Sequence, residues 1–318
     1  MKKIAYFILI MFFAAGCYYD IDVNHDPNFK PHLSVFSYIQ AGKPFYVFVS
    51  KSDYPGEVDS NDILTNAQVE VLTQTGETML PDSSENGYYY FSPVNDEKFR
   101  ISVKALDMES HADVSFPPVV PLPEISVNPY NINFVSDTNN VYYLDYELKI
   151  TFKLDDDPGQ ENAYGAYFYT HEAVFYYDTV TNVQTDSILW YFKTALYLYG
   201  DEMTNSNYSY VDLGDGLSYN NLIFADGVLN GKTITLNLDA YNSKQVKGQP
   251  ATDTVFCVYY SFPMELYKYA KSLERYSETR NNPFVEPVDI YSNFSQGIGL
   301  AAAYRVIDTI PVIVNLQQ

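Results

Sequence analysis

The sequence is poor in the residue types that most often build metal and redox sites. Its 318 residues include two cysteines, four histidines and one tryptophan. The histidines His25, His32, His111 and His171 stand apart, and none of them shows the spacing of an HExxH or HxH metal motif. We therefore expect isolated packing or surface histidines, with no metal site and no cofactor.

Basic residues are also few. Lysine and arginine number 19 against 40 aspartates and glutamates, which gives a formal net charge of −21. A chain this acidic repels phosphate backbones and anionic lipid surfaces. Nucleic acid is therefore not an expected partner, and any attachment to a membrane must be covalent or pass through another protein.

Catalytic motifs are missing as well. The sequence contains no GxSxG, no GxGxxG after a strand and no P-loop lysine motif. Because 40 acidic residues make carboxylate pairs unavoidable, the existence of such pairs indicates nothing about hydrolysis. We expect that the protein is not an enzyme, and a cryptic hydrolase is the least favoured hypothesis.

The amino terminus predicts a lipid anchor at Cys17. Two lysines precede an apolar run at residues 4–13, which is shorter than the roughly 20 residues that span a bilayer. Small residues at 14–16, as a signal peptidase requires, come directly before the cysteine, so the segment resembles a bacterial lipobox. In that pattern Cys17 is diacylated and becomes the new amino terminus; a plain secretory signal is the alternative. We assign residues 1–16 to a lipoprotein signal peptide and 17–31 to a tether.

Acidic residues follow the cysteine closely. Asp20, Asp22 and Asp26 resemble the export signal that directs some Bacteroidota lipoproteins to the outer face of the outer membrane. The expected location is therefore the outer membrane, with the body anchored through acyl chains on Cys17 and facing the cell exterior.

The body of the chain has the pattern of a β protein. Aromatic residues make up 17%, mostly 32 tyrosines and 20 phenylalanines, which suit pleated, half-buried surfaces. Residues 32–116 form short strand-like runs separated by turn residues, with strict alternation in "FRISVKAL". This spacing predicts an N-terminal β-sandwich domain of immunoglobulin-like size. The four prolines within residues 117–123 predict a linker.

Residues 124–318 predict a second β-rich domain with longer strands. "VYYLDYELKITFKL" alternates over twelve residues, and the runs at 163–179 and 187–200 are apolar on both faces, which predicts central strands. "DGVLNGKTITLNLDAY" reads as a hairpin that turns at Asn230 and Gly231. Apolar residues spaced three and four apart predict a helix near 262–279 that packs on its own sheet or, alternatively, on a partner. The fold class is mainly β, with two β-sandwich-like domains.

Three further features leave alternatives open. The acidic cluster Asp155, Asp156 and Asp157, followed by a Pro-Gly pair, is a solvated hairpin turn or a calcium site. Cys257 lies in an apolar run and is interpreted as a small buried hydrophobe. Paired and triple tyrosines can pack in the strands, form a protein interface or stack on sugar rings. These tyrosines lie at 88–90, 142–143, 176–177 and 259–260.

The carboxy-terminal quarter carries a recognisable signature, in the order Asn-Pro-Phe, Pro, Tyr-Ser-Asn and Gly-x-Gly. Its positions are Asn282, Pro283, Phe284, Pro287, Tyr291, Ser292, Asn293, Gly297 and Gly299. The signature, together with "MELYKYAKSL", "AQVEVL", "ENGYYYF" and "DDDPGQENAYGAYFY", resembles a Bacteroidota outer-membrane lipoprotein family of unknown function, domain of unknown function 4249. The resemblance implies a lipoprotein commonly encoded beside a TonB-dependent transporter, and it implies no catalytic residues.

Two functions follow as hypotheses. The first is a lipid-anchored, non-catalytic accessory or ligand-capture protein that works with an outer-membrane TonB-dependent transporter. The second is a surface adhesin that binds glycans or peptides.

Overall fold

The structure is a computed structural model that describes most of the chain beyond the tether. The described residues are 30–52, 62–136, 141–159, 161–181, 183–199, 222–225, 231–279, 286 and 288–317. Cys17 and Asn230 lie outside them, as do the signature residues Asn282, Pro283, Phe284 and Pro287.

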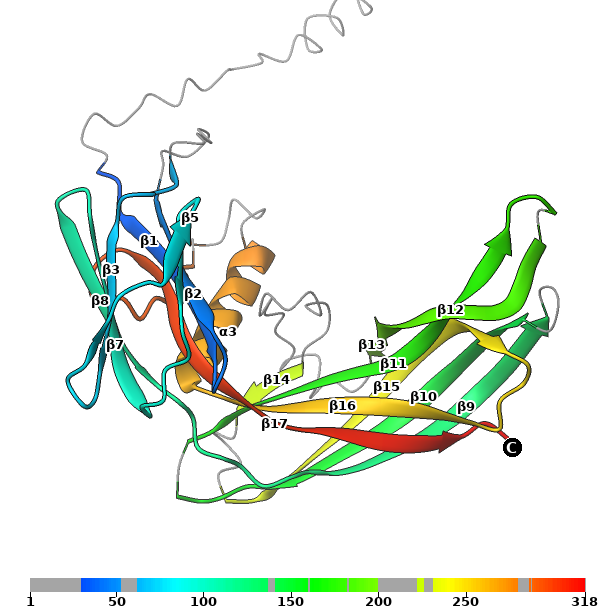
Figure 1. The fold of residues 1–318 in the computed structure, drawn as a ribbon. Coiled ribbons are helices and arrows are strands. Elements are labelled where there is room, and N and C mark those ends of the chain that lie inside the picture. The colour runs from blue at the N-terminus through cyan, green and yellow to red at the C-terminus, as the bar shows by residue number, and fades with distance from the viewer. Residues whose placement is uncertain are drawn as a thin grey trace, which may run out of the picture.

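The described residues form three sheets and one helix (Figure 1). The largest sheet contains β1 (Leu33–Gln40), β2 (Phe45–Lys51), β5 (Ser83–Glu85), β6 (Tyr88–Phe91), β11 (Ala163–Asp178), β12 (Val183–Ala195), β14 (Leu222–Ala225), β16 (Thr252–Phe262) and β17 (Ile298–Asn315). A second sheet contains β9 (Glu124–Ser136), β10 (Val141–Asp155), β13 (Tyr197–Tyr199) and β15 (Thr233–Lys247). The third contains β3 (Gln68–Thr73), β4 (Thr78–Met79), β7 (Lys98–Ala105) and β8 (Met108–Ser115). The helix is α3 (Met264–Thr279).

The mainly β prediction is confirmed, and the alternation behind it is visible in the burial of the strands. β3 buries Val69 and Val71 while their neighbours are exposed, and β7 buries Ile101 and Val103 in the same way. In β10 every second residue from Leu144 to Leu154 is buried. One apolar face per strand therefore drives each sheet onto a facing layer.

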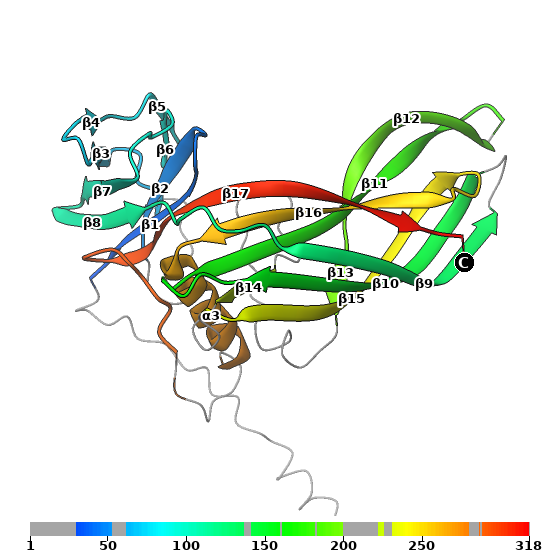
Figure 2. The ribbon, with the colours of Figure 1, turned by 90° about the horizontal axis from the view of Figure 1, so that it is seen from below.

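Two sandwiches share the largest sheet. Its strands run in the order β12-β11-β16-β17-β1-β2-β6-β5. One end of this sheet packs against the β4-β3-β7-β8 sheet; we call this unit the N-terminal sandwich. The other end packs against the β13-β15-β10-β9 sheet and forms the C-terminal sandwich. The two units lie at opposite ends of an elongated molecule (Figures 1 and 2).

Helix α3 covers the opposite face of the shared sheet. It buries Leu266, Tyr269 and Ala270 against aromatic and small residues of β11, β16 and β17, as the three-four spacing predicts. It begins directly after Pro263, whose carbonyl oxygen accepts a hydrogen bond from the Leu266 amide at 3.1 Å. The interpretation of a helix packed on its own sheet holds.

Strand β17 belongs to both sandwiches. Its first residues, Ile298 to Tyr304, pair in parallel with β1, and its later residues pair antiparallel with β16. Phe294, Ala301 and Ala303 consequently lie in the core of the N-terminal sandwich, although the sequence placed them in a domain of residues 124–318. The proline-rich stretch does connect the sandwiches, since β8 ends at Ser115 and β9 begins at Glu124.

The prediction that residues 187–200 form a central strand is wrong. β12 is the outermost strand of the large sheet, paired on one side with β11. Apolar residues on both faces indicate burial only if the chain itself supplies covering layers, and here much of the strand is exposed.

The predicted hairpin at Asn230 and Gly231 falls partly outside the described residues. Gly231 has a φ of 74°, and β15 pairs with β10 and β13.

Glycine is required where β17 meets β1. Gly297 and Gly299 have φ values of 89° and 134°, which residues with a side chain rarely adopt. A Cβ at Gly299 would overlap the carbonyl oxygen of Val35, and one at Gly297 would overlap that of Leu33. The Gly-x-Gly of the signature therefore lets two backbones approach closely enough to pair.

We expect Gly299→Ala to lower the free energy of unfolding by about 3 kcal/mol or more, because a forbidden φ and a backbone overlap act together. Gly42→Ala is the matched control: its φ is 71°, but open space surrounds the position. The control should lose about 1 kcal/mol. Urea denaturation of both variants measures the difference, and equal losses would contradict the close-approach argument.

Candidate functional site

The acidic cluster for which the sequence left a turn or a calcium site open makes hydrogen bonds that stabilise a turn. The buried carboxylate of Asp156 accepts hydrogen bonds from the Tyr164 hydroxyl and, at 2.8 Å, from the Gly231 amide. Asp155 accepts a hydrogen bond from the hydroxyl of Thr233, and Asp157 accepts one from the Gly159 amide. These carboxylates point to different partners, and the described part of the chain contains no group of three potential metal ligands.

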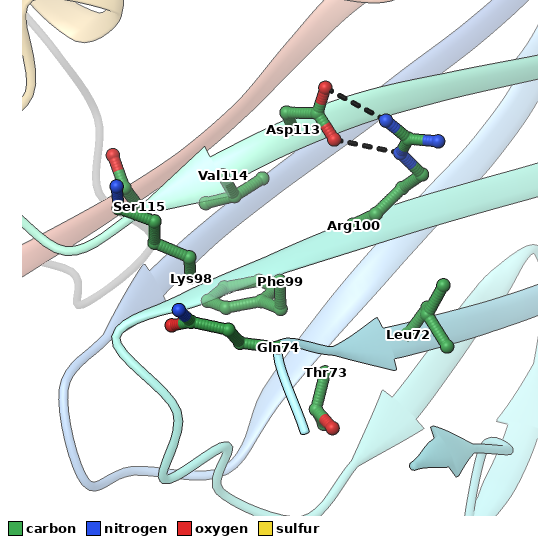
Figure 3. A pocket seen from close by; sticks show the side chains of 9 residues that line it. All are labelled: Leu72, Thr73, Gln74, Lys98, Phe99, Arg100, Asp113, Val114 and Ser115. Carbon is green, nitrogen blue, oxygen red and sulfur yellow. Dashed lines mark hydrogen bonds and ion pairs between the residues drawn. The ribbon is translucent and has the colours of Figure 1, made fainter. Parts of the chain in front are cut away.

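A shallow hollow lies on the outer face of the N-terminal sandwich (Figure 3). Strands β3, β7 and β8 line it. Arg100 on β7 and Asp113 on β8 are opposite each other on these neighbouring strands, and the guanidinium of Arg100 donates two hydrogen bonds, of 2.7 and 3.0 Å, to the carboxylate. Hydrogen bonding from Arg100 lowers the pKa of the Asp113 carboxyl below its ordinary value. The two charges compensate each other on an exposed face, so the hollow offers a ligand little unbalanced charge.

A more unusual arrangement lies inside the C-terminal sandwich. The inward-facing positions of β15 are apolar at Leu236, Leu238 and Ala240, and then become polar at Asn242 and Lys244. Both polar side chains are buried, and the side chain of Lys244 is only 4% exposed. Buried ammonium groups are rare unless they are paired, so their partners define the site.

Lys244 is held by a connected set of polar groups, which we call the polar layer: Lys244, Asp253, Tyr146 and Asn242. Its ammonium nitrogen lies 2.6 Å from Asp253 Oδ2 and donates to the carbonyl oxygen of His171 at 3.0 Å. The Tyr146 hydroxyl donates to the same carboxylate and accepts a hydrogen bond of 2.8 Å from Asn242 Nδ2. The layer thereby joins the two facing sheets.

Burial and a neighbouring negative charge favour the protonated form of the Tyr146 hydroxyl. Burial, followed by the negative charge of Asp253, raises the pKa of Tyr146 well above its usual range. The hydroxyl therefore keeps its proton and acts as a donor. Asp253 is also stabilised by the amide of Thr254, which donates to Oδ1 at 2.8 Å. The Asp253 carboxylate is thus contacted by Lys244, Tyr146 and Thr254.

A cavity of about 370 Å³ borders the polar layer. It opens between β11, β12, β15 and β16, at the end of the C-terminal sandwich where the β11–β12 hairpin diverges from the other strands (Figure 1). Its lining combines two lysines and one carboxylate with aromatic and aliphatic groups. The residues that characterise it are Lys244, Lys247, Asp253, Tyr191, Phe256 and Ile188.

Strand β12 also exposes apolar side chains to solvent. Four consecutive residues, Leu189, Trp190, Tyr191 and Phe192, are between 43% and 61% exposed; we call them the β12 row. On the adjacent strand Tyr176 and Tyr177 are exposed as well, whereas Tyr259 and Tyr260 are buried. The tyrosine clusters therefore divide between core packing and accessible surface.

The family of this chain follows from a protein-family model that covers nearly all of the residues after the predicted signal peptide. The model for a domain of unknown function, DUF4249, matches residues 18–309. The chain belongs to the DUF4249 family. No curated protein matches the DUF4249 chain. A crystal structure of a mutant Salmonella alpha-2-macroglobulin is similar at 9% identity and a TM-score of 0.23, covering 89% of this chain and 15% of that one, which is too distant to inform function.

The predicted and observed sites of this DUF4249 chain differ. Cys17 lies outside the described residues, so its lipidation stays a prediction. His32, His111 and His171 lie on separate strands or strand ends. Within the described ranges no helix has the length and hydropathy that crossing a bilayer requires.

Sequence reasoning missed the polar layer, although a signal was present. In "TITLNLDAYNSKQVK" the inward positions run Ile, Leu, Leu, Ala, Asn, Lys and Val, so Asn242 and Lys244 interrupt an apolar period. Asp253 similarly interrupts the inward positions of β16. A charged residue in the buried phase of a strand indicates a partner on the facing sheet.

We expect Lys244→Met to destabilise the protein by about 3 kcal/mol, because Asp253, whose side chain is 14% exposed, is left largely out of water without its counter-charge. The double variant Lys244→Met/Asp253→Asn should lose less than the sum of its two single variants, since it removes both charges together. Chemical denaturation of all four proteins gives the coupling energy.

The same cycle on the exposed pair Lys153 and Glu124 is the control, with side chains that are 44% and 80% exposed. Its coupling should be much smaller. Equal coupling in the two cycles would refute the view that the polar layer is energetically coupled.

Proposed function

We propose that this protein is a lipid-anchored, surface-exposed and non-catalytic accessory protein that captures a ligand and works with an outer-membrane TonB-dependent transporter. The lipobox-like segment and Cys17 support the anchor, and the family-like signature supports the setting. The body then needs a surface that contacts a partner and a place that holds a ligand.

The β12 row is the observation that carries this proposal. Large apolar side chains that are exposed on both faces of an edge strand are uncommon on a body that needs no partner. Among the described residues β12 is also an edge strand, and proteins usually protect the outer side of such a strand or use it for pairing. Aromatic residues are enriched in protein interfaces, so the row suits contact with another protein.

The position of the row relative to the anchor supports the same function. β1 follows the tether and lies at one end of the molecule, while the β11–β12 hairpin lies at the other (Figures 1 and 2). Residues 17–31 reach at most about 50 Å when fully extended. A tether of that length would allow the far end of the body to approach a partner in the same membrane.

A second function, a surface adhesin, is favoured by the exposure of Trp190. Its side chain is 58% exposed, and exposed aromatic rings can stack on sugars. A hydrolase is less favoured. Glycoside hydrolysis by paired carboxylates needs two such groups in one cleft. Among the described residues Asp253 is the one acidic residue that lines the cavity, and it is already paired with Lys244.

We expect Cys17→Ala to abolish lipidation and release the protein from the outer-membrane fraction, because the apolar run at residues 4–13 is too short to span a bilayer and the acidic chain is repelled by anionic lipid. Membrane fractionation with immunoblotting measures the shift. Cys257→Ala is the control: this thiol is buried, and the variant should stay in the membrane fraction. Retention of the Cys17 variant in that fraction would overturn the anchor.

We expect the detergent-extracted protein to co-purify with a TonB-dependent barrel and the variant Trp190→Ser/Phe192→Ser to lose that partner at least tenfold. Quantitative mass spectrometry of chemically crosslinked eluates measures the ratio. Leu80→Ser/Leu122→Ser removes two exposed apolar residues elsewhere and should retain the partner.

Two results would count against the transporter function. The first is a protein that elutes without a barrel, and the second is a barrel that both double variants retain equally. Binding to a glycan array that is lost in the Trp190 variant would favour the adhesin instead.

A further inference from the structure

We propose that the outer face of the β13-β15-β10-β9 sheet binds a neutral glycan chain, with tyrosine rings that stack on sugar rings and carboxylates that accept hydrogen bonds from sugar hydroxyls. The inference deepens the proposed function, on which it rests for the role of ligand capture. Binding belongs to the body alone, so it is measured without the transporter.

Strand pairing places three tyrosines and a glutamate in one line across this sheet; we call them the tyrosine line. Tyr197 on β13 pairs with Tyr241 on β15, and Tyr241 pairs with Glu147 on β10. Glu147 in turn pairs with Tyr130 on β9. Side chains of paired residues point to the same side of a sheet. Neighbouring strands are about 4.8 Å apart, so the line extends over about 14 Å, which suits a short run of sugar units.

The rings of the tyrosine line face solvent. Tyr197 is 62% exposed and Tyr241 is 44% exposed, whereas their neighbours along each strand are buried. Tyr130 is half-buried at the far end of the line. Tyr199 extends the aromatic surface, since its ring centre lies 6.5 Å from that of Tyr197. Exposed apolar patches often mark binding surfaces, and the flat face of a tyrosine ring matches the C–H face of a sugar.

A β-bulge adds a polar group to the line. The pairing of β9 with β10 shifts register between Asp145 and Glu147, and Asn131 has a φ of 51°. Asn131 directly follows Tyr130, yet its Nδ2 donates to Oε2 of Glu147 at 3.1 Å, on the same outer face. Bulges redirect side chains and are frequent beside functional sites. This one brings an amide and a ring to the same carboxylate.

Hydrogen bonds position the rings and the carboxylates before any ligand arrives. The Tyr130 hydroxyl donates to Oδ1 of Asp239 at 3.2 Å, and the Lys149 ammonium lies 5.5 Å from the centre of the Tyr130 ring. The Tyr241 hydroxyl donates to Oδ1 of Asp145 at 3.4 Å. A carboxylate can accept about four hydrogen bonds, so these groups can also accept sugar hydroxyls. Groups that are fixed in advance lose less conformational entropy on binding.

The alternation of rings with carboxylates favours a glycan over a protein partner. The centre of a protein interface is depleted in charged residues, and a protein docked here would remove Asp145, Glu147 and Asp239 from water. Sugar hydroxyls instead donate to these carboxylates, and such charge-assisted hydrogen bonds are stronger than neutral ones. The formal net charge of −21 repels glycans that carry acidic groups. A neutral chain is therefore the expected ligand.

The test is affinity electrophoresis of the full chain in native gels, with a detergent that contains no sugar. Each gel holds one soluble polysaccharide: neutral xyloglucan, galactomannan or amylopectin, or anionic polygalacturonate. We expect at least one neutral polysaccharide to retard the protein and polygalacturonate to leave its mobility unchanged. Retardation by none of the neutral polysaccharides, or equal retardation by polygalacturonate, would overturn the proposal.

Two double variants locate the binding face. Tyr197→Ala/Tyr241→Ala removes the two exposed rings and should raise the dissociation constant at least tenfold, as measured from mobility against polysaccharide concentration. The control Trp190→Ser/Phe192→Ser removes two exposed rings of the β12 row and should bind like the parent chain. Equal effects of the two double variants, or a loss confined to the β12 variant, would refute the assignment to this face.

Glu147→Gln tests the carboxylate separately. It keeps the shape of the side chain and should weaken binding about threefold, because neutral hydrogen bonds are weaker than charge-assisted ones. If the double tyrosine variant does not fold, as judged by circular dichroism, Tyr197→Ala alone decides, and unchanged affinity in that variant would refute the assignment. The result is independent of the transporter, because a protein can bind the polysaccharide and still elute without a barrel, or the reverse.

Discussion

The architecture depends on the parallel pairing of β1 with the first half of β17. This contact joins the beginning of the described chain to its end, and it turns what would be two separate sheets into one sheet that serves both sandwiches. It requires a backbone approach that only glycine allows, at Gly297 and Gly299. Arg305, just beyond the paired segment, donates to the carbonyl oxygen of Pro117 and contacts Glu97, so the linker is held at the same junction.

A shared sheet has consequences for the candidate site. The apolar core of the C-terminal sandwich fills the space between the sheets as far as Ala240, and beyond it the layer of Tyr146, Asn242, Lys244 and Asp253 takes over. Such a layer adds little to the net free energy of folding, because buried charges lose hydration that their pairing only partly restores. This layer also borders the cavity that β11, β12, β15 and β16 line.

The surface of the protein separates two kinds of recognition. Its long-range field is acidic and repels anionic polymers and other copies of itself. Close contact is therefore expected to come from apolar groups, and the β12 row provides them on an edge strand at the end of the molecule far from β1. The row is also next to the cavity, since Tyr191 of the row lines it.

The sequence by itself determined the elements that obey a local period. The alternation in β3, β7 and β10 and the three-four spacing in α3 each follow from which side chains avoid water, so they could be read residue by residue. The small residues before Cys17 likewise predict an anchor from local chemistry alone.

Only the tertiary structure decided features that depend on what lies opposite a strand. β12 has the apolar pattern of a central strand, yet no further strand covers it among the described residues, because burial depends on available neighbours and not on composition. Lys244 and Asp253 are nine residues apart in sequence on consecutive strands of different sheets, and only the facing of those sheets makes them a pair. The place of β17 in both sandwiches is non-local in the same way, since no local pattern indicates that residue 299 will lie beside residue 35.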